Sequence, residues 1–143
     1  MKNQIDDVRV FMQACNQNTP DKPIQELELS EARLRVALIA EELGELALGL
    51  GLNVEIQMNT FERDDNIHKF DRVEVLDALA DLCYVVFGAA VAVGQHDILP
   101  EAFSRVNFSN MTKVVHGKCV KDATGKVMKP AGYMPPQLEL CFE

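Results

Sequence analysis

A long apolar stretch of this chain carries three acidic side chains and no basic one. It reads LIAEELGELALGLG (residues 38–51), and no Lys or Arg occurs between Arg35 and Arg63. Its carboxylates are those of Glu41, Glu42 and Glu45. In an α-helix, at about 100° per residue, these three carboxylates point into one arc. A carboxylate in apolar surroundings is costly unless it is paired or coordinated, so positive charge must come from elsewhere.

A second apolar stretch repeats this pattern. Between Val73 and Gln95 the only charged residues are Glu74, Asp77 and Asp81, which lie within about 60° of one another on a helical projection. Like charges three and four residues apart destabilise a helix, so two such faces packed together need cations between them. The donors are all oxygen, which favours Mg²⁺, with Mn²⁺ as a close substitute and Ca²⁺ less suitable. The predicted metal ligands are Glu41, Glu42, Glu45, Asp77 and Asp81, with Glu74 as an additional candidate.

A solvated helix face is the commonest explanation of a sequence such as EELGEL when it stands alone. Such a face usually lies opposite an apolar one and mixes Lys or Arg with its acids. Here apolar residues surround the acids on all sides, and a second stretch repeats the arrangement. Together the two stretches favour the metal site over the solvated face.

The whole chain has the composition of one globular domain, residues 1–143. Its 143 residues are 48% hydrophobic and 25% charged, as in ordinary globular proteins. The formal net charge of -8 argues against a nucleic-acid partner, which needs a basic surface. The longest apolar run, residues 82–94, is too short to span a bilayer. We therefore expect neither nucleic acid nor membrane as a partner, and a cytoplasmic location.

The cysteines show no paired spacing with one another or with His. They are Cys15, Cys83, Cys119 and Cys141. A disulfide framework or a zinc site is therefore not expected, and reduced thiols in the cytoplasm fit this pattern better.

Apolar periodicity and helix start and stop residues predict a mainly helical protein. We expect helices over residues 5–15, from Ser30 as N-cap to about residue 50, over 71–93 and from Pro100 onward. Residues 52–70 are expected to form a short helix or a loop. The predicted fold class is all-α, with four or more helices in a core of about residues 1–112. The tail, about 113–143, is expected to form two short β-like runs around the turn at 122–125 and to end irregularly.

The tail is rich in lysine. Its first half contains Lys113, Lys118, Lys121, Lys126 and Lys129. A solvated hairpin is the usual explanation of such a segment, and we adopt it for Lys121, which stands beside the turn. Contact with an anionic ligand is the alternative for the others.

The acidic motifs resemble those of the all-α nucleoside triphosphate pyrophosphohydrolases, which include MazG, the dimeric dUTPases and phosphoribosyl-ATP pyrophosphohydrolase. The signature of that group is E-E-x-x-E on one helix and E-x-x-D on the next, and residues 41–45 match its first half. DALADLCYVVFGAA (77–90) is similar to the MazG-like branch, as are VRVFMQAC near the start and VNFSNMTK and GKVMKPAGYMPP later. The resemblance covers most of the chain and implies a MazG-like helical bundle.

The second half of the signature departs from the family pattern. If Asp81 is its aspartate, Ala78 occupies the glutamate position and Asp77 must replace it. If Glu74 and Asp77 form the literal E-x-x-D, Asp81 is an extra ligand. We prefer the first alignment because the following Leu-Cys-Tyr fits the MazG-like branch.

The resemblance implies Mg²⁺-dependent hydrolysis of a nucleoside triphosphate between its α and β phosphates, giving a monophosphate and pyrophosphate. Glu41 or Glu42 would orient or deprotonate the attacking water. Asn110, Lys113 and, less strongly, Lys126 would bind the substrate. Related proteins form dimers or dimers of dimers, and the apolar excess of both acidic stretches independently favours a homo-oligomer.

Two other readings of the acids compete with an enzyme. One is a catalytically silent helical protein whose metal serves assembly or nucleotide binding, and the Ala78 departure keeps this reading open. The other is a di-iron carboxylate protein, which requires Glu-x-x-His pairs. We rank the di-iron reading last because neither acidic stretch contains His.

Overall fold

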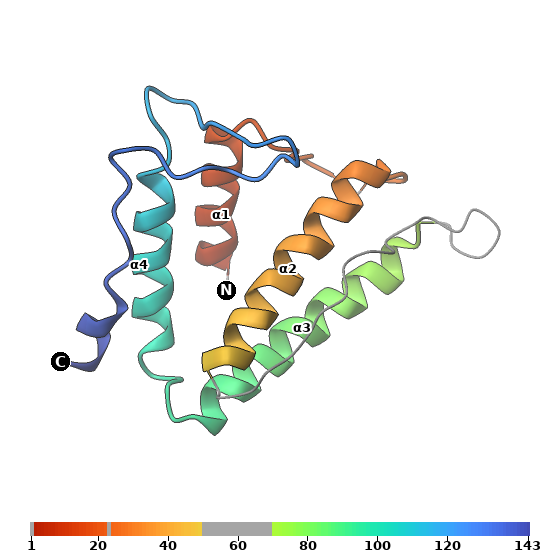
Figure 1. Ribbon diagram of the computed structural model, residues 1–143. Coiled ribbons are helices and arrows are strands. Elements are labelled where there is room, and N and C mark those ends of the chain that lie inside the picture. The colour runs from red at the N-terminus through yellow and green to blue at the C-terminus, as the bar shows by residue number, and fades with distance from the viewer. Residues whose placement is uncertain (1, 23, 50–69) are drawn as a thin grey trace. The chain divides into compact units, whose positions relative to one another are not determined.

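The computed structural model describes residues 2–22, 24–49 and 70–143, and helices dominate these ranges (Figure 1). The four α-helices are α1 (Lys2–Ala14), α2 (Leu29–Gly49), α3 (Arg72–Ala92) and α4 (Leu99–Met111). A 3₁₀ helix, η1 (Leu138–Phe142), lies near the end of the chain. The described ranges contain no β-strand, so the all-α prediction is confirmed.

The helix positions agree with the sequence analysis to within a few residues. α2 begins at Leu29, and the amide of Ala32 donates to the carbonyl of Glu28 (3.0 Å). Ser30 therefore lies inside the first turn of α2, and its prediction as the N-cap is wrong by one to two positions, as is common at helix ends. Of the segment predicted as short helix or loop, residues 52–69 lie outside the described residues.

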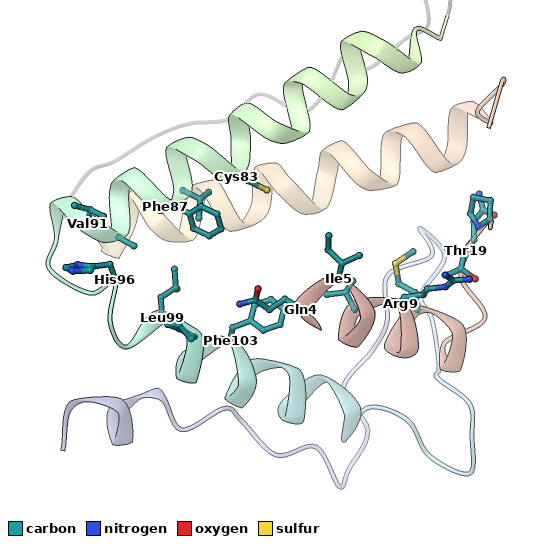
Figure 2. Close-up of a pocket in the computed structure, with 17 residues that line it drawn as sticks. Gln4, Ile5, Arg9, Thr19, Cys83, Phe87, Val91, His96, Leu99 and Phe103 are labelled. Carbon is teal, nitrogen blue, oxygen red and sulfur yellow. The ribbon is translucent and has the colours of Figure 1, made fainter. Parts of the chain in front are cut away.

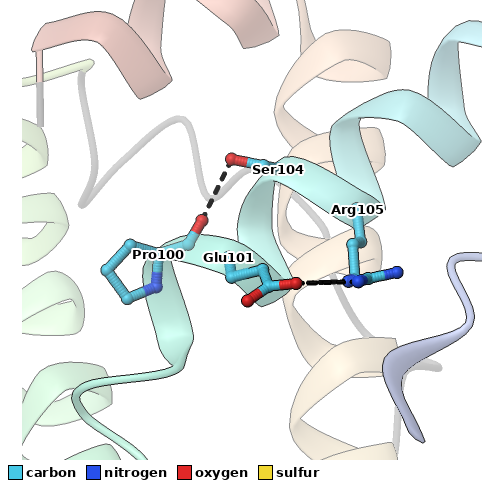
Figure 3. A network of polar contacts seen from close by, with 4 residues as sticks. All are labelled: Pro100, Glu101, Ser104 and Arg105. Carbon is cyan, nitrogen blue, oxygen red and sulfur yellow. Dashed lines mark hydrogen bonds and ion pairs between the residues drawn. The ribbon is translucent and has the colours of Figure 1, made fainter. Parts of the chain in front are cut away.

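Local side-chain contacts stabilise the first turns of α4. Pro100 occupies the first turn, where its missing amide hydrogen costs nothing. Arg105 binds the carboxylate of Glu101 one turn earlier through Nε (2.9 Å) and a terminal nitrogen (2.7 Å), and Ser104 donates to the carbonyl of Pro100 (3.1 Å; Figure 3). The hydrogen bond from Arg105 to Glu101 raises the pKa of Arg105 above its ordinary value. Exposed pairs of this kind contribute only a few tenths of a kcal/mol (about 0.3–0.5).

The chain divides into two compact units. One comprises Met1–Lys22 and Val73–Glu143, and the other comprises Pro23–Arg72. The first unit therefore holds α1, α4, η1 and almost all of α3, whereas the second holds α2. Within the first unit, α4 contacts both α1 and η1.

The C-terminal tail folds back onto α4 (blue in Figure 1). Its first turn joins Val115 and Lys118 by an isolated antiparallel bridge, and a second isolated bridge joins Lys121 and Val127 around the turn at 122–125. Gly125, with φ +90°, occupies a backbone conformation that favours glycine. The predicted hairpin is thus present only as isolated bridges, because the pairing does not extend far enough to form strands.

A disulfide joins Cys15 and Cys119, with 4.8 Å between their Cα atoms. The Cys15 side chain is buried, and nearby the ammonium of Lys121 donates to the carbonyl of Asn16 (3.0 Å). The prediction that the cysteines form no disulfide is therefore wrong. The two cysteines are 104 residues apart in sequence, and the return of the tail to the end of α1 brings them together.

The surface of α3 is largely apolar and mostly exposed. None of its residues is buried, and Leu76 and Tyr84 are 69% and 80% exposed. Among the described residues, α3 is the one helix long and apolar enough to cross a membrane, judged by length and composition alone. Asp81 lies near its middle, and an aspartate at that depth in a bilayer costs about 2.5–3.5 kcal/mol or more.

Candidate active site

The first acidic motif lies on α2, in the smaller unit. Glu41, Glu42 and Glu45 are all exposed there. Residues three and four apart on a helix are neighbours, so Glu45 follows both Glu41 and Glu42 by one turn. Two apolar neighbours, Leu43 and Leu46, are themselves 53% and 45% exposed. The acids of α2 are therefore accessible to a ligand, on a helix that also exposes several apolar side chains.

The second acidic motif lies in the first half of α3. Glu74, Asp77 and Asp81 are exposed and follow one another at spacings of three and four residues. The structure thus places each acidic motif along one side of its own helix, as predicted.

The predicted metal ligands do not gather into a metal site among the described residues. Within residues 2–22, 24–49 and 70–143, no three His, Cys, Asp or Glu side chains form a group that could hold a metal ion. The predicted ligands of α2 and those of α3 belong to different units. The chemistry of the donors still fits a hard divalent cation, because they are all accessible carboxylates.

The predicted phosphate contacts, Asn110 and Lys113, lie together at the end of α4. The ammonium of Lys113 donates to the side-chain oxygen of Asn110 (2.7 Å), and both residues are half-buried. The structure therefore brings together these two of the three predicted substrate-binding residues.

Lys126 belongs to the turn at 122–125 instead. The Asp122 carboxylate accepts hydrogen bonds from the Thr124 amide (2.8 Å), the Thr124 hydroxyl (2.7 Å) and the Lys126 amide (3.1 Å). The Thr124 hydroxyl is the largest of the contacts that lower the pKa of Asp122. The described contacts of Lys126 are thus those of a turn residue, and its exposed side chain remains accessible to a ligand.

Tyr133 lies close to Lys113 and was not among the predicted site residues. Two ammonium groups each lie over a face of its ring, with Lys113 Nζ 5.8 Å and Lys129 Nζ 5.0 Å from the ring centroid. The only feature of the sequence that pointed to Tyr133 was its place in the motif GKVMKPAGYMPP. Its contact with Lys113, which lies 20 positions earlier, leaves no periodic pattern in the sequence.

Comparison with known proteins assigns the chain to a family. The phosphoribosyl-ATP pyrophosphohydrolase family matches residues 7–105, more than half of the chain and a range that contains both acidic motifs. The chain belongs to this family. The predicted resemblance to the all-α nucleoside triphosphate pyrophosphohydrolases is thereby confirmed.

A solved structure resembles this protein over nearly its whole length. It is the crystal structure of a protein from Exiguobacterium sp. 255-15 provisionally assigned as an NTP pyrophosphohydrolase, with 25% sequence identity and a TM-score of 0.71. The similarity covers 98% of this chain and 94% of that one, so it includes the tail beyond residue 105. No curated protein is similar enough to count as a match. Family and structure together indicate a hydrolase that acts on phosphoanhydride bonds of nucleotides.

The larger unit of this protein also contains an open cavity of about 870 Å³. Apolar side chains dominate its lining, and Figure 2 shows Ile5 of α1, Phe87 of α3 and Phe103 of α4 around it. Its polar lining includes Arg9 and Asn18. None of the predicted site residues is among the described residues that line this cavity.

Proposed function

We propose that this protein hydrolyses a nucleoside triphosphate at the α–β phosphoanhydride bond, releasing a nucleoside monophosphate and pyrophosphate. The main support is that the family match spans both acidic helices, residues 41–45 and 74–81. The name of the Exiguobacterium protein, an NTP pyrophosphohydrolase, points to the same class of substrate. House-cleaning of altered nucleotides or control of the deoxynucleotide pool would be the purpose of such a reaction.

In this proposal Mg²⁺, for which Mn²⁺ can substitute, is the cofactor. Carboxylates from α2 (Glu41, Glu42, Glu45) and α3 (Asp77, Asp81) would hold it, and Glu74 is an additional candidate. When bound, a divalent cation polarises phosphoryl oxygens and lowers the pKa of water. A triphosphate and these acids are both strongly negative, so the proposal requires the cation to bring them together.

Helix α2 would also supply the general base. Glu41 or Glu42 would accept a proton from the attacking water or orient it toward the phosphorus. Both carboxylates are exposed on α2, so either can reach a solvent molecule. A positioned general base contributes about 10²–10⁴-fold to a rate.

The end of α4 would bind the phosphates. Asn110 and Lys113 already contact one another there, and an amide and an ammonium are both hydrogen-bond donors to phosphate oxygens. Lys126 would add a second charge from the tail. These residues would bind the leaving pyrophosphate.

A second copy of the chain would cover α3. Apolar patches as extensive as that of α3 mark interaction surfaces in soluble proteins. A homodimer or a dimer of dimers would bury it. The proposed partners are thus a second copy of the chain and the nucleotide, with neither a membrane nor a nucleic acid among them, and the proposed location is the cytoplasm.

The test is pyrophosphate release from a panel of NTPs and dNTPs with Mg²⁺. We expect turnover of one subset of nucleotides, and a loss of about 10²–10⁴-fold in kcat/KM for Glu42→Gln and for Asp81→Asn. EDTA should abolish turnover, and added Mg²⁺ or Mn²⁺ should restore it. Glu28→Gln is the matched control, because Glu28 is an exposed acid just before α2.

The alternative is a catalytically silent protein whose metal serves assembly or nucleotide binding. It predicts no pyrophosphate from any nucleotide, together with a Mg²⁺-dependent rise in thermal stability that Asp81→Asn removes. That result would reject the enzymatic proposal while keeping the metal site.

A further inference from the structure

The tail of this chain contains a loop, residues 113–132, that is attached to α4 at both ends. It begins where α4 ends. After it, the backbone of Met134 forms hydrogen bonds with two side-chain hydroxyls at the end of α4 (2.7 and 3.0 Å). Between these two points the loop reaches the end of α1, where Cys119 forms its disulfide with Cys15. The disulfide therefore holds the middle of the loop to a different helix from the one that holds its ends.

The central part of this loop has hydrogen bonds of its own. An isolated bridge joins Lys121 and Val127, and the amide of Met128 donates to the carbonyl of Val120 (2.8 Å). The carboxylate of Asp122 binds the turn between these two segments. All of these bonds lie within the loop and do not depend on α1. The segment can thus leave α1 without losing them.

The disulfide is the strongest contact between this loop and α1. The ammonium of Lys121 also donates to the carbonyl of Asn16 (3.0 Å), but this hydrogen bond is exposed and contributes little by itself. Val120 and Met128 are 67% and 48% exposed, so the loop buries little apolar surface. Breaking the covalent bond would therefore remove most of what these contacts supply.

The two ends of the disulfide differ in accessibility. Cys15 is 1% exposed, whereas Cys119 is half-buried. The exposed Lys118 precedes Cys119, and Lys121 follows two positions later. Positive charge near a cysteine attracts an incoming thiolate and stabilises the thiolates that reduction produces. Cys119 is thus the end of the disulfide at which a reductant can attack.

We propose that the Cys15–Cys119 disulfide is a redox switch that a dithiol reductant opens by attack on Cys119. The attacking thiolate forms a bond to Sγ of Cys119 as the bond between the two cysteines breaks, and Cys15 leaves as a thiolate that takes a proton. The second thiol of the reductant then displaces Cys119 from the mixed disulfide. In sum, the protein disulfide gains two electrons and two protons, and the dithiol becomes a disulfide. The loop is then free of α1.

This inference rests on the proposed location for its reductant and on the proposed function for what it regulates. Cytoplasmic dithiols keep thiols reduced, and a disulfide that forms there is usually transient or redox-sensing. The loop contains Lys126, one of the predicted substrate contacts. Release of the loop would leave this charge less firmly positioned and would weaken substrate binding.

The first experiment measures reduction of the full chain by thioredoxin, a dithiol protein. In an equimolar mixture of reduced and oxidised thioredoxin, alkylation and mass spectrometry should find most chains reduced at equilibrium. A purely structural disulfide would stay oxidised in this mixture. A thioredoxin that lacks its second cysteine should be trapped as a mixed disulfide, and peptide mapping should find it on Cys119 and not on Cys15.

Nuclear relaxation of the backbone amides measures release of the loop. On reduction, order parameters over residues 118–128 should fall from about 0.85 to below about 0.6, the range of flexible backbone. Met134, which hydrogen bonds hold to α4, should keep its value. Cys119→Ser should reproduce the reduced wild type without a reductant. Cys141→Ser, at a free cysteine, should behave as the wild type does in both redox states.

Kinetics with a substrate nucleotide measure the regulation. Reduction should raise KM by about fivefold, as expected for one weakened charged contact, and leave kcat nearly unchanged. Cys119→Ser should have the KM of the reduced wild type in either condition. Lys126→Gln should have a raised KM that no longer responds to reduction. Equal KM in the two redox states of the wild type would overturn the regulatory role.

The outcomes separate the redox switch from the proposed function. Reduction by thioredoxin with release of the loop, but without hydrolysis of any nucleotide, would support the switch and reject the enzyme. Hydrolysis by chains whose disulfide stays oxidised in the thioredoxin mixture would support the enzyme and overturn the switch. Equal order parameters in the two redox states overturn the switch whatever the activity.

Discussion

α3 and the junction between α4 and the tail belong to the same unit but differ in the contacts they offer. α3 offers exposed apolar side chains, whereas the junction is held by hydrogen bonds. α3 has 21 residues, none of them buried, and its side chains are mostly apolar. The junction is short and polar, and the buried Ser109 hydroxyl and the Thr112 hydroxyl fasten the backbone of Met134 on both sides. Directional hydrogen bonds specify one position for the tail, whereas an apolar helix surface accepts any cover of suitable shape.

The largest expected effect concerns the apolar surface of α3. Val85→Asp places a charge on it at a residue that is 60% exposed in the single chain. If a second copy covers this surface, the buried charge should cost on the order of 4 kcal/mol, about a thousandfold in the dissociation constant. Analytical ultracentrifugation over a dilution series measures the shift.

The control is the same substitution on another helix. Val10 of α1 is 55% exposed, so Val10→Asp should leave the association unchanged. Equal sedimentation of the wild type and Val85→Asp at every concentration would show that this part of α3 is no subunit interface.

The disulfide adds a covalent link between the tail and the end of α1. Cys119→Ser should lower the free energy of unfolding by about 2–4 kcal/mol, because the cross-link between residues 104 apart restricts the unfolded chain. Urea unfolding with and without a dithiol reductant measures the loss, which the reductant should reproduce in the wild type. Cys141→Ser, at a free cysteine, should unfold as the wild type does. If the reductant did not change the free energy of unfolding of the wild type, this result would contradict the expected stabilisation.

Two serines of α4 test the hydrogen bonds that hold the tail. Ser109→Ala leaves the carbonyl of Met134 without its donor and should cost about 1–3 kcal/mol. Ser104→Ala, on the same helix, removes an exposed bond to the carbonyl of Pro100 and should change stability by less than about 0.5 kcal/mol. Urea unfolding of both variants gives the comparison. Equal losses would mean that the burial of Ser109 adds nothing to the attachment of the tail.

The smallest expected effect concerns pH and the turn at 122–125. Hydrogen bonds lower the pKa of Asp122 below its ordinary value of 3.8. The ionised carboxylate therefore stabilises the turn above pH 3.8, and this contribution is lost as the pH falls through the lower pKa of the folded state. The stability difference between wild type and Asp122→Asn should be constant from pH 7 to about pH 5 and should shrink below about pH 4.

Backbone amide exchange at Thr124 and Lys126, followed by NMR during acid titration, locates this effect in the turn. Asp97→Asn, at another exposed aspartate, should leave the exchange of both amides unaltered. Exchange that is independent of pH between 5 and 2, after correction for the intrinsic rate, would contradict the role given to the carboxylate.

The four helices and the two acidic motifs could be predicted because their signals are local. An apolar period and stop residues such as Gly94 act within a few positions of the helix they define. The spacing of Glu41, Glu42 and Glu45 likewise follows from helix geometry alone. The family resemblance was also present in these short motifs, and the match over residues 7–105 confirms it.

The contacts of the tail could not be predicted from such signals. Cys15 and Cys119 are 104 residues apart, and the absence of paired spacing concealed their bond. The Tyr133 ring meets Lys113 only because Ser109 and Thr112 bind the next residue, Met134.

The sequence by itself determined which segments are helical, where the acids stand on them and to which family the chain belongs. Only the tertiary structure decided that the tail returns to the end of α1, where it forms the disulfide, and to α4, where the Tyr133 ring meets Lys113. The physical reason is the distance along the sequence over which each interaction acts. Helix formation and side-chain spacing depend on neighbours within one or two turns, whereas a buried hydroxyl or a thiol selects its partner by position in space.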